Sequence, residues 1–531
     1  MVTFIAVLLF LLAISILVIF HEFGHFITAK LFGMRAEKFY LFMNPGLSLF
    51  RMKKFNGKWH FKFLSPNTKR SVRTKKDEEG NAIFEDTELS WFDRVVMKKQ
   101  PERKEVEELI PLEELEDDDW SKYPEITEYG IGWLPFGGFV KIAGMIDESI
   151  DKQQLKQAPN SWEFRAKPAW QRFIVITAGV IMNLIIGIVI FSFSHLIFTK
   201  HYTPIENIKE GIYAYPYANY LGFENGDLIT AIDGKKVERA EDVCMNGKLS
   251  YEFILSKEVT VLRNGVLKNI EIPDTLLSFY KTGNPIIGFD IYPVVVDTVL
   301  PFYRVKKEGQ KHIDTIISSA YISGLKAKAE ILYINGEKIY NFGHFKETLL
   351  FNKEKDIQLI AKQNNRIDTL TVFVGSDGKI GISQKYPDYE QKNYTFLSSI
   401  KFGNKDAIGS MMANIKGFGK IASGQMSARE SLSGPLGILL IFKDGVKDDL
   451  TIIWEFFWKL TAIFSMALAF MNILPIPALD GGHALFILIE IIIRRPLPEK
   501  FLIYIQYLGM LLLLALMVFA TWNDIMKIFM K

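Results

Sequence analysis

Four long stretches without a charged residue constrain the fold of this 531-residue chain more than any other feature. Each reaches the roughly 20 apolar residues that a helix needs to cross a bilayer. A long segment of ordinary soluble composition separates the second stretch from the third. The chain is therefore expected to be a polytopic α-helical membrane protein with a large extramembrane insert. The stretches cover residues 1–20, 173–198, 460–479 and 501–522.

Charge and cysteine content narrow the class of protein. A formal net charge of +3 gives no reason to expect nucleic acid as a partner. Cys244 is the single cysteine, which rules out an internal disulfide. The first apolar stretch has no basic region before it and no small-residue cleavage site. We therefore expect it to remain as a membrane span rather than to be removed as a signal peptide.

Lysine and arginine near the ends of the apolar stretches predict the orientation, because cytoplasmic loops carry an excess of both. They cluster after the first stretch, before the second, and between the third and fourth. We therefore expect residues 31–168 in the cytoplasm, with both termini and the insert outside. The residues that decide this are Lys30, Arg35, Lys38, Arg51, Lys53, Lys54, Arg165, Lys167, Arg172, Arg494 and Arg495.

Two segments between the first and second spans differ in character. Residues 31–130 are interpreted as a cytoplasmic charged insertion, since residues 51–128 are polar and alternate in charge. Residues 131–145 contain the sequence GWLPFGGFVKIAG, which is apolar and rich in glycine. That composition favours a tight, membrane-associated β-hairpin whose backbone another segment approaches closely.

The insert contains a weak internal repeat. In both copies a Gly-hydrophobic pair precedes a strand, and the strand turns through Asp233-Gly234 or Asn335-Gly336, a strong hairpin signal. The two segments, 207–273 and 293–375, resemble PDZ domains. The first carries the full Gly-Asp-x-Ile-x-x-hydrophobic-Asp-Gly pattern from Gly226 to Gly234. The second has Lys-Ala-Glu, residues 328–330, where Gly-Asp is usual.

The rest of the chain is assigned by apolar length and spacing. Residues 396–450 combine apolar residues with many glycines, which favours amphipathic helices on the membrane surface. Residues 484–493 are apolar but too short to span a bilayer, and they contain Glu490, so a packed or interfacial helix is expected at residues 484–495. The four spans are placed at residues 1–30, 170–198, 451–482 and 501–523.

The first span ends in the sequence HEFGH, which carries ionisable side chains where they are costly. His21 and His25 are four residues apart on a helix, so both imidazoles can reach one cation. Glu22 lies off that face and suits a general base acting on water. Two histidines that only cap a helix at the membrane interface are the alternative interpretation of this motif.

A third ligand is sought where another apolar span is interrupted by a carboxylate. In the sequence MNILPIPALDGGHALF, Asp480 follows Pro475 and Pro477, which prevent a regular helix. Irregular backbone at membrane depth is tolerated where it lines a cavity or is buried in protein, so Asp480 is the candidate. The alternative is an aspartate that ends a helix in a cytoplasmic turn.

The sequences HEFGH and NILPIPALDGG together resemble the site-2 protease family of intramembrane zinc metalloproteases. The GGFVKIAG segment, the paired PDZ-like units and the sequence SGPLGI resemble its bacterial RseP-type branch, which regulates the envelope stress response through anti-sigma factors. The resemblance implies Zn²⁺ held by His21, His25 and Asp480, with Glu22 as general base. It implies that Asn472 lies near the substrate backbone and leaves His483 outside the ligand set. The residues that it places beside a substrate segment are Gly137, Gly138, Phe139, Val140 and Lys141.

The implied function is regulated intramembrane proteolysis. The substrates would be single-span membrane proteins, such as anti-sigma factors or signal-peptide-like segments, already shortened by a site-1-type protease. Cleavage would release a cytosolic fragment from a bacterial inner membrane. The alternatives are a catalytically silent, membrane-anchored PDZ scaffold and a zinc transporter. Glu22 has no use in a scaffold, and the chain shows no pair of broken helices in two matching halves, as many transporters do.

Overall fold

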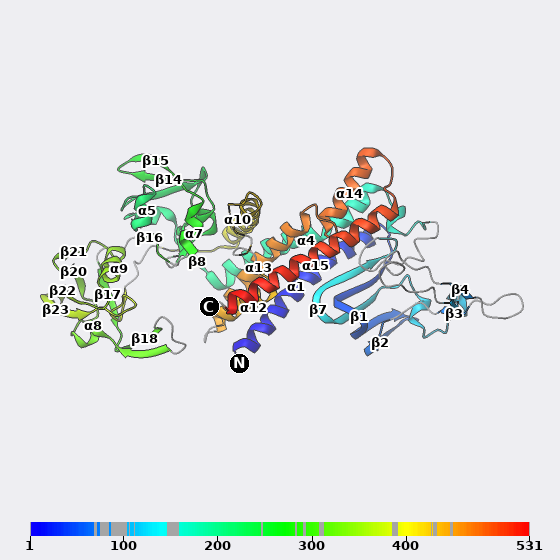
Figure 1. Cartoon of the computed structure of the whole chain (residues 1–531), viewed down its shortest axis with the longest axis horizontal. Coiled ribbons are helices and arrows are strands. Elements are labelled where there is room, and N and C mark those ends of the chain that lie inside the picture. Colours follow the sequence, from blue (N-terminus) through cyan, green and yellow to red (C-terminus); the bar gives the residue numbers. More distant parts are fainter. Residues whose placement is uncertain are drawn as a thin grey trace, which may run out of the picture. The chain divides into compact units, whose positions relative to one another are not determined.

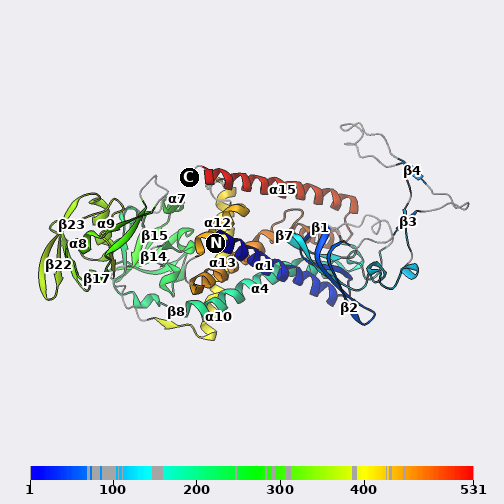
Figure 2. The ribbon, with the colours of Figure 1, turned by 90° about the horizontal axis from the view of Figure 1, so that it is seen from below.

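The computed structural model forms two compact units, Met1–Phe191 with Arg429–Lys531, and Ser192–Ala428. Figures 1 and 2 show the helices of the first unit and the β-rich domains of the second. The structure describes residues 2–67, 72–74, 84–86, 103–105, 107–110, 112–145, 159–245, 248–281, 284–289, 294–306, 313–384, 391–425, 427, 429, 433–446 and 450–529.

Four helices in the described residues are long and apolar enough to cross a membrane, which confirms the predicted number of spans. They belong to α1 (Val2–Leu31), α4 (Ala169–Ser194), α13 (Leu450–Ile473) and α15 (Glu499–Phe529). A π-helical turn, His195–Thr199, extends α4. The predicted third span, 451–482, is too long, because α13 already ends at Ile473. The predicted short helix begins earlier than residue 484, since α14 runs from Asp480 to Ile493.

A sheet of three long strands lies along α1 (Figures 1 and 2). Its order is β2-β1-β7, so β7 is an edge strand. The strands are β1 (Ala36–Phe55), β2 (Lys58–Pro66) and β7 (Glu128–Ile142). Residues 36–66 of the predicted charged insertion thus form β1 and β2. Of residues 68–111 the structure describes little besides β3 (Val72–Thr74), β4 (Phe84–Asp86), β5 (Arg103–Glu105) and β6 (Glu107–Leu109).

The predicted hairpin at residues 131–145 is wrong in its pairing. Both parts of β7 pair with β1 instead of with each other, and Leu41 aligns with Gly138 as well as with Ile131. The glycines serve this contact, because a Cβ built on Gly130 would lie 2.3 Å from the Tyr40 ring. The sequence correctly indicated close backbone approach, but the approaching strand lies about 90 residues earlier in the chain.

The second unit contains two β-rich domains, each with its own apolar core. The first has a four-stranded sheet in the order β11-β10-β14-β15 and the pair β16-β9. Its elements are β9 (Ile212–Ala214), α5 (Pro216–Tyr220), β10 (Leu228–Ile232), β11 (Lys235–Lys236), β12 (Cys244–Met245), β13 (Lys248–Leu249), α6 (Tyr251–Ile254), β14 (Glu258–Arg263), β15 (Val266–Glu271), α7 (Thr275–Lys281) and β16 (Ile287–Phe289).

The second domain is built on a sheet with the main order β23-β22-β20-β17-β24, to which β21 is added beside β20. Its elements are β17 (Val294–Val299), β18 (Phe302–Lys306), β19 (Ile313–Ile317), α8 (Ser319–Ile322), β20 (Glu330–Ile334), β21 (Glu337–Lys338), α9 (Phe342–Phe351), β22 (Asp356–Gln363), β23 (Arg366–Phe373) and β24 (Ile382–Gln384).

The internal repeat corresponds to equivalent backbone in the two domains. Gly226 and Lys328, which occupy the same repeat position, both have positive φ, at 87° and 63°. The backbone N–H at the equivalent position of the preceding turn is hydrogen-bonded in both domains, although the acceptors come from different segments. In the first domain Glu224 N donates to Asp227 Oδ2, and in the second Lys326 N donates to Gln363 Oε1. The departure from the Gly-Asp pattern therefore leaves the turn intact.

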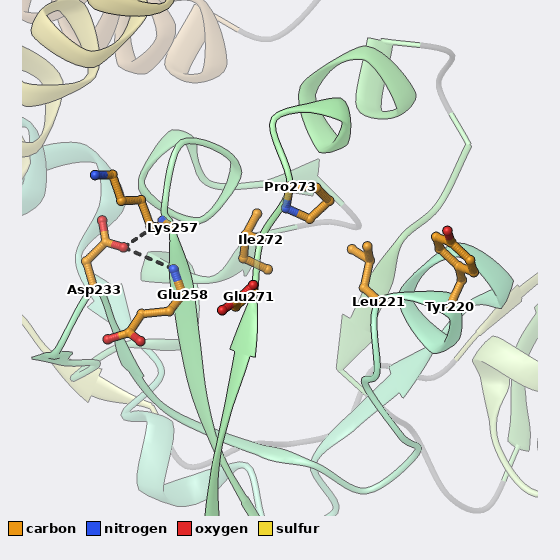
Figure 3. Close-up of a pocket in the computed structure, with 8 residues that line it drawn as sticks. All are labelled: Tyr220, Leu221, Asp233, Lys257, Glu258, Glu271, Ile272 and Pro273. Atoms are coloured by element: carbon orange, nitrogen blue, oxygen red, sulfur yellow. Dashed lines mark hydrogen bonds between the residues drawn. The ribbon is translucent and has the colours of Figure 1, made fainter.

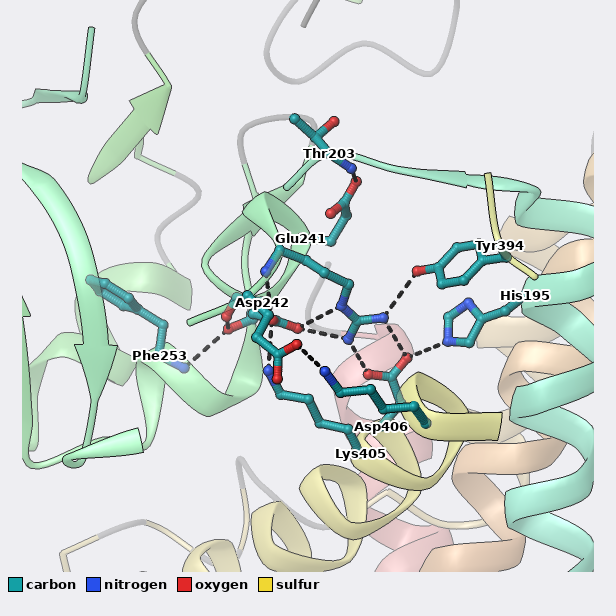
Figure 4. A network of polar contacts seen from close by, with 12 residues as sticks. His195, Thr203, Glu241, Asp242, Phe253, Tyr394, Lys405 and Asp406 are labelled. Atoms are coloured by element: carbon teal, nitrogen blue, oxygen red, sulfur yellow. Dashed lines mark hydrogen bonds and ion pairs between the residues drawn. The ribbon is translucent and has the colours of Figure 1, made fainter. Parts of the chain in front are cut away.

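Helix α10 (Phe396–Ala422) packs on the first domain through its lysines. Lys405 pairs with Asp242, Lys416 with Asp233 and Lys420 with Asp274, at 2.6–2.7 Å. The network in Figure 4 extends this contact to the end of α4. The strands β8 (His201–Tyr202) and β25 (Lys392–Asn393) pair nearby in the second unit.

Candidate metal centre

Three metal-ligating side chains from opposite ends of the chain meet in the first unit. His21 and His25 lie one turn apart in α1, and Asp480 is the first residue of α14. His21 Nε2 lies 3.3 Å from Asp480 Oδ2, and His25 Nε2 lies 3.5 Å from the same oxygen. The two Nε2 atoms are 3.3 Å apart. The structure thus brings together all three residues predicted as ligands.

The triangle of these three atoms has the dimensions of a zinc site. Zinc–nitrogen and zinc–oxygen bonds of about 2.0–2.2 Å at tetrahedral angles separate the ligand atoms by roughly 3.3–3.5 Å. Asp480 Oδ2 is buried without a hydrogen bond of acceptable geometry among the described residues. Three convergent donors and a buried carboxylate oxygen therefore fit a tetrahedral cation that keeps its fourth position for water.

The break between α13 and α14 positions Asp480. Pro475 and Pro477 have no N–H to donate, and Ala478 has a φ of +74°, so the helix cannot continue. Glycines then hold α14 against the broken segment. A Cβ on Gly481 would lie 2.3 Å from Leu474 O, and one on Gly482 would lie 2.4 Å from Ile476 O. The Asp-Gly-Gly sequence therefore fixes the carboxylate by close backbone packing.

Helix α4 supplies the support for both histidines. A Cβ on Gly24 would lie 2.4 Å from Ala178 O, so α1 and α4 are in close contact beside the site. A Cβ on Gly179 would lie 2.4 Å from His25 Nε2, so only glycine leaves space for the imidazoles. Sequence reasoning missed this role of α4. The available signal was a glycine followed four residues later by Asn183 within an otherwise apolar span.

Glu22 faces the β-sheet. The backbone of Val140 in β7 hydrogen-bonds to its carboxylate. A Cβ built on Gly138 would lie 3.6 Å from Glu22 Cγ and 2.5 Å from Val18, so Gly138 lets the strand approach α1. The structure thus places the predicted general base between the histidine face of α1 and the edge strand of the sheet.

The other residues predicted on this strand contact β1. Phe139 stacks on Tyr40 with ring centroids 5.2 Å apart, and Lys141 pairs with Glu37 at 2.9 Å. Gly137 has a φ of +77°, and a Cβ there would meet no atom within 4 Å. The side chains of Phe139 and Lys141 therefore stay on their own sheet, and of the two glycines only Gly137 has open space beside it.

Two residues of the second motif also lie at the centre or beside it. Asn472, in the last turn of α13, has its Nδ2 3.4 Å from His21 Nε2. His483 follows Asp480 by one turn of α14 and hydrogen-bonds to Gln506 of α15. Asn472 therefore borders the cluster, whereas His483 contacts α15.

A cavity of about 800 Å³ lies in the first β-rich domain (Figure 3). Its walls include Asp233, Lys257, Glu258 and Tyr220. Asp233 Oδ1 accepts hydrogen bonds from the backbone amides of Lys257 and Glu258, at 2.7 and 3.3 Å. Asp233 therefore ties the β10–β11 turn to the start of β14, and the candidate metal ligands His21, His25 and Asp480 belong to the other unit.

Comparison with known proteins agrees with this geometry. The sequence profile described as peptidase family M50 matches residues 9–101 and 120–516. The chain belongs to peptidase family M50. This family comprises the site-2 proteases, so the M50 chain is a zinc-dependent metalloprotease, as the sequence predicted.

Several relatives of this chain are named as proteases. The chain is 25% identical to the regulator of sigma-W protease RasP of Bacillus subtilis, over 76% of this chain and 87% of that protein. It is 25% identical to the zinc metalloprotease RasP of Bacillus licheniformis over 76% and 88%. A Clostridium perfringens protein with a zinc metalloprotease name is 24% identical over 97% of both chains.

Proposed function

We propose that the chain is an intramembrane zinc endopeptidase in which His21, His25 and Asp480 hold the metal. The observation that carries this proposal is the triangle of ligand atoms, with sides of 3.3–3.5 Å, at the end of a membrane-length helix. A zinc ion bound there supplies a Lewis acid that polarises a carbonyl group and lowers the pKa of water.

The residues around this centre are proposed to transfer the proton and to bind the substrate backbone. Glu22 takes a proton from the attacking water and delivers it to the leaving amine, and the Val140 backbone orients its carboxylate. The Asn472 amide, 3.4 Å from His21 Nε2, is placed to hydrogen-bond the substrate backbone. Position supports these assignments, since Asn472 borders the triangle and Glu22 neighbours His21 in α1 and faces β7.

The substrate is proposed to be a single-span helical protein that unwinds at the site. An intact helix bonds all its amides internally, so freed N–H and C=O groups need new partners within the membrane. Because β7 is an edge strand, residues 137–141 can add a substrate segment to the sheet by β-augmentation. This strand also contacts Glu22, so a segment paired there lies next to the general base.

The proposed setting is the inner membrane of a bacterium, with residues 31–168 in the cytoplasm and both termini outside. The motif then lies near the cytoplasmic side, and cleavage releases a cytosolic fragment. Substrates arrive after a site-1-type protease has shortened them. We further propose that the two β-rich domains are PDZ-like and exclude bulky ectodomains. Replacing residues 207–375 with a flexible linker should then allow cleavage of an untrimmed reporter that the full chain rejects.

Helix α10 is proposed to lie on the outward-facing surface of the inner membrane, which makes membrane lipid a partner. Its lysines face the first domain, whereas its exposed side carries apolar residues such as Ile408, Ile415 and Phe418. It also crosses the end of α4, because a Cβ on Gly403 would lie 2.3 Å from Ser192 Oγ. A helix at the end of a span, with its apolar side outward, fits the interface.

The function is tested by cleavage of a membrane-anchored, trimmed reporter in proteoliposomes. The wild-type chain should cut the reporter, while Glu22→Gln should lower the rate by about 10²–10⁴-fold. Metal analysis should find one zinc in both proteins, because Glu22 is not a ligand. A Glu22→Gln protein that cuts at the wild-type rate would contradict the proposed mechanism. Absence of cleavage by the wild type, with peptide binding to residues 207–375, would favour the silent scaffold.

A further inference from the structure

One face of α4 contacts the Nδ1 atoms of His21 and His25, the ring nitrogens that do not face the proposed metal position. Val175, Gly179 and Asn183 are spaced by four residues, so they lie along one side of the helix. His25 Nδ1 lies 2.8 Å from Val175 O. Since a carbonyl oxygen can only accept, His25 Nδ1 carries the proton, and its Nε2 presents a lone pair to the site.

His21 needs the same arrangement but has a different neighbour. Its Nε2 faces Asp480 and His25 at 3.3 Å, so this nitrogen is the one directed at the metal position. In a neutral imidazole that binds metal through Nε2, Nδ1 carries the proton and requires an acceptor. The atom found 3.2 Å from His21 Nδ1 is Asn183 Nδ2, which is a donor.

The unpaired atom of Asn183 resolves this mismatch. Asn183 is 1% exposed, and its Oδ1 is buried without a hydrogen-bond partner among the described residues. The oxygen and nitrogen of an amide have nearly the same shape, so a half-turn about the last side-chain bond exchanges their places. The exchange breaks no hydrogen bond of Oδ1 within the described part of the chain.

We propose that Asn183 is a positioning residue whose Oδ1 accepts the proton of His21 Nδ1 when the centre holds zinc. This inference rests on the proposed ligand set. The amide fixes His21 in the tautomer that leaves Nε2 free and orients the ring toward Asp480. Ser465 Oγ donates to Asn183 O at 2.7 Å, so the backbone at this position is held independently of the amide.

Zinc affinity of the purified full-length chain, measured by competition with chelators of known affinity, tests this role. Asn183→Asp keeps an acceptor of the same size, whereas Asn183→Leu keeps the approximate shape and removes every polar atom. We expect Asn183→Asp to bind zinc within a few-fold of wild type or more tightly. Asn183→Leu should bind about 10–100-fold more weakly, which is the usual cost of losing an outer-shell partner.

Two controls separate the possible failures. Thermal unfolding should show that wild type and both variants are folded at the temperature of the binding measurement, so that weaker binding is not unfolding. If Asn183→Asp binds as weakly as Asn183→Leu, the amide acts as a donor and the inference is wrong. It is also wrong if Asn183→Leu binds like wild type while His21→Ala loses zinc. If His21→Ala itself retains full affinity, the proposed ligand set fails instead. The absorption spectrum of the cobalt-substituted protein gives a second readout. It should change in Asn183→Leu, whereas in Asn183→Asp it should still indicate a tetrahedral metal site.

Discussion

The two units of the molecule each contain a partly buried cluster of histidine and aspartate. In the first unit His21 and His25 meet Asp480. In the second, His195 at the end of α4 meets Asp406 of α10, with Nε2 and Oδ2 2.7 Å apart (Figure 4). In both clusters a histidine from an apolar, membrane-length helix meets a carboxylate more than 200 residues later in the chain.

The two clusters differ in where the balancing cation comes from. Arg239 pairs with both Asp406 and Asp242, and it also donates to Tyr394 OH at 3.1 Å. Asp480 forms no ion pair with lysine or arginine among the described residues. A buried carboxylate requires a cation or hydrogen-bond donors. The protein supplies the guanidinium in one cluster, whereas the other is suited to an added metal ion.

The largest expected effect comes from removing the carboxylate of each cluster in turn. Asp480→Ala should lose tightly bound zinc and lower reporter cleavage by about 10³-fold or more, because two histidines alone hold the ion poorly. Asp406→Ala should retain one zinc per chain. Metal analysis of the two purified variants makes the comparison. Full zinc occupancy in Asp480→Ala, or zinc loss in Asp406→Ala, would remove the distinction between the clusters.

A smaller effect is expected on the stability of the second unit. Asp406→Ala leaves the Arg239 guanidinium buried with one partner fewer while Asp242 remains, which should cost about 1–3 kcal/mol of unfolding free energy. The double variant Arg239→Met with Asp406→Leu removes both charges and should recover part of that loss. Chemical denaturation, followed by hydrogen exchange in α10 and β10, measures the change. Equal stability of Asp406→Ala and wild type would show that the network is not a stabilising element.

The pH dependence of this network gives a narrower test. Burial alone would raise the pKa of Asp406, but the His195 hydrogen bond and the Arg239 guanidinium lower it to about 2. A pKa lower in the folded than in the unfolded state stabilises the fold above the ordinary value near 3.8. That contribution should disappear as the pH falls from about 4 toward 2. Over this interval the unfolding free energy of Asp406→Asn should change less with pH than that of wild type. If the two proteins showed the same dependence on pH, Asp406 would not be the group responsible.

The smallest expected effect lies at the exposed margin of the same network. Lys401 pairs with Glu238 where both side chains are more than one-third exposed. Such pairs contribute about 0–1 kcal/mol and weaken with salt. Lys401→Ala should therefore change the unfolding free energy by less than about 1 kcal/mol in the same denaturation experiment. If Lys401→Ala lost as much unfolding free energy as Asp406→Ala, the exposed pair would stabilise the fold as much as the buried part of the network does.

Membrane placement of α10 can be measured because Cys244 is the single cysteine and is buried. In a Cys244→Ser background, a fluorophore on Ile415→Cys should be quenched by brominated lipids in proteoliposomes. A fluorophore on Glu354→Cys, an exposed position of the second domain, serves as the unquenched control. Equal quenching at the two positions would argue against contact of the α10 apolar side with lipid.

Local patterns of the sequence were sufficient for the spans and the ligand types. Apolar length predicted four spans, and the four-residue spacing of HEFGH placed both histidines on one helical face. The two prolines before Asp480 indicated the helix break that presents the carboxylate. Each of these inferences depends on residues within one or two turns of one another, where backbone sterics and periodicity dominate.

Tertiary structure alone decided which distant segments complete these features. The glycine-rich strand pairs with β1 rather than with itself, α4 supplies Val175, Gly179 and Asn183 to the histidines, and Arg239 balances Asp406. In sequence, Asp480 and Asp406 are both carboxylates remote from the histidines that they meet. Only the folded chain shows which of them faces a guanidinium and which faces two imidazoles, because the cation that a buried charge requires is supplied by non-local packing.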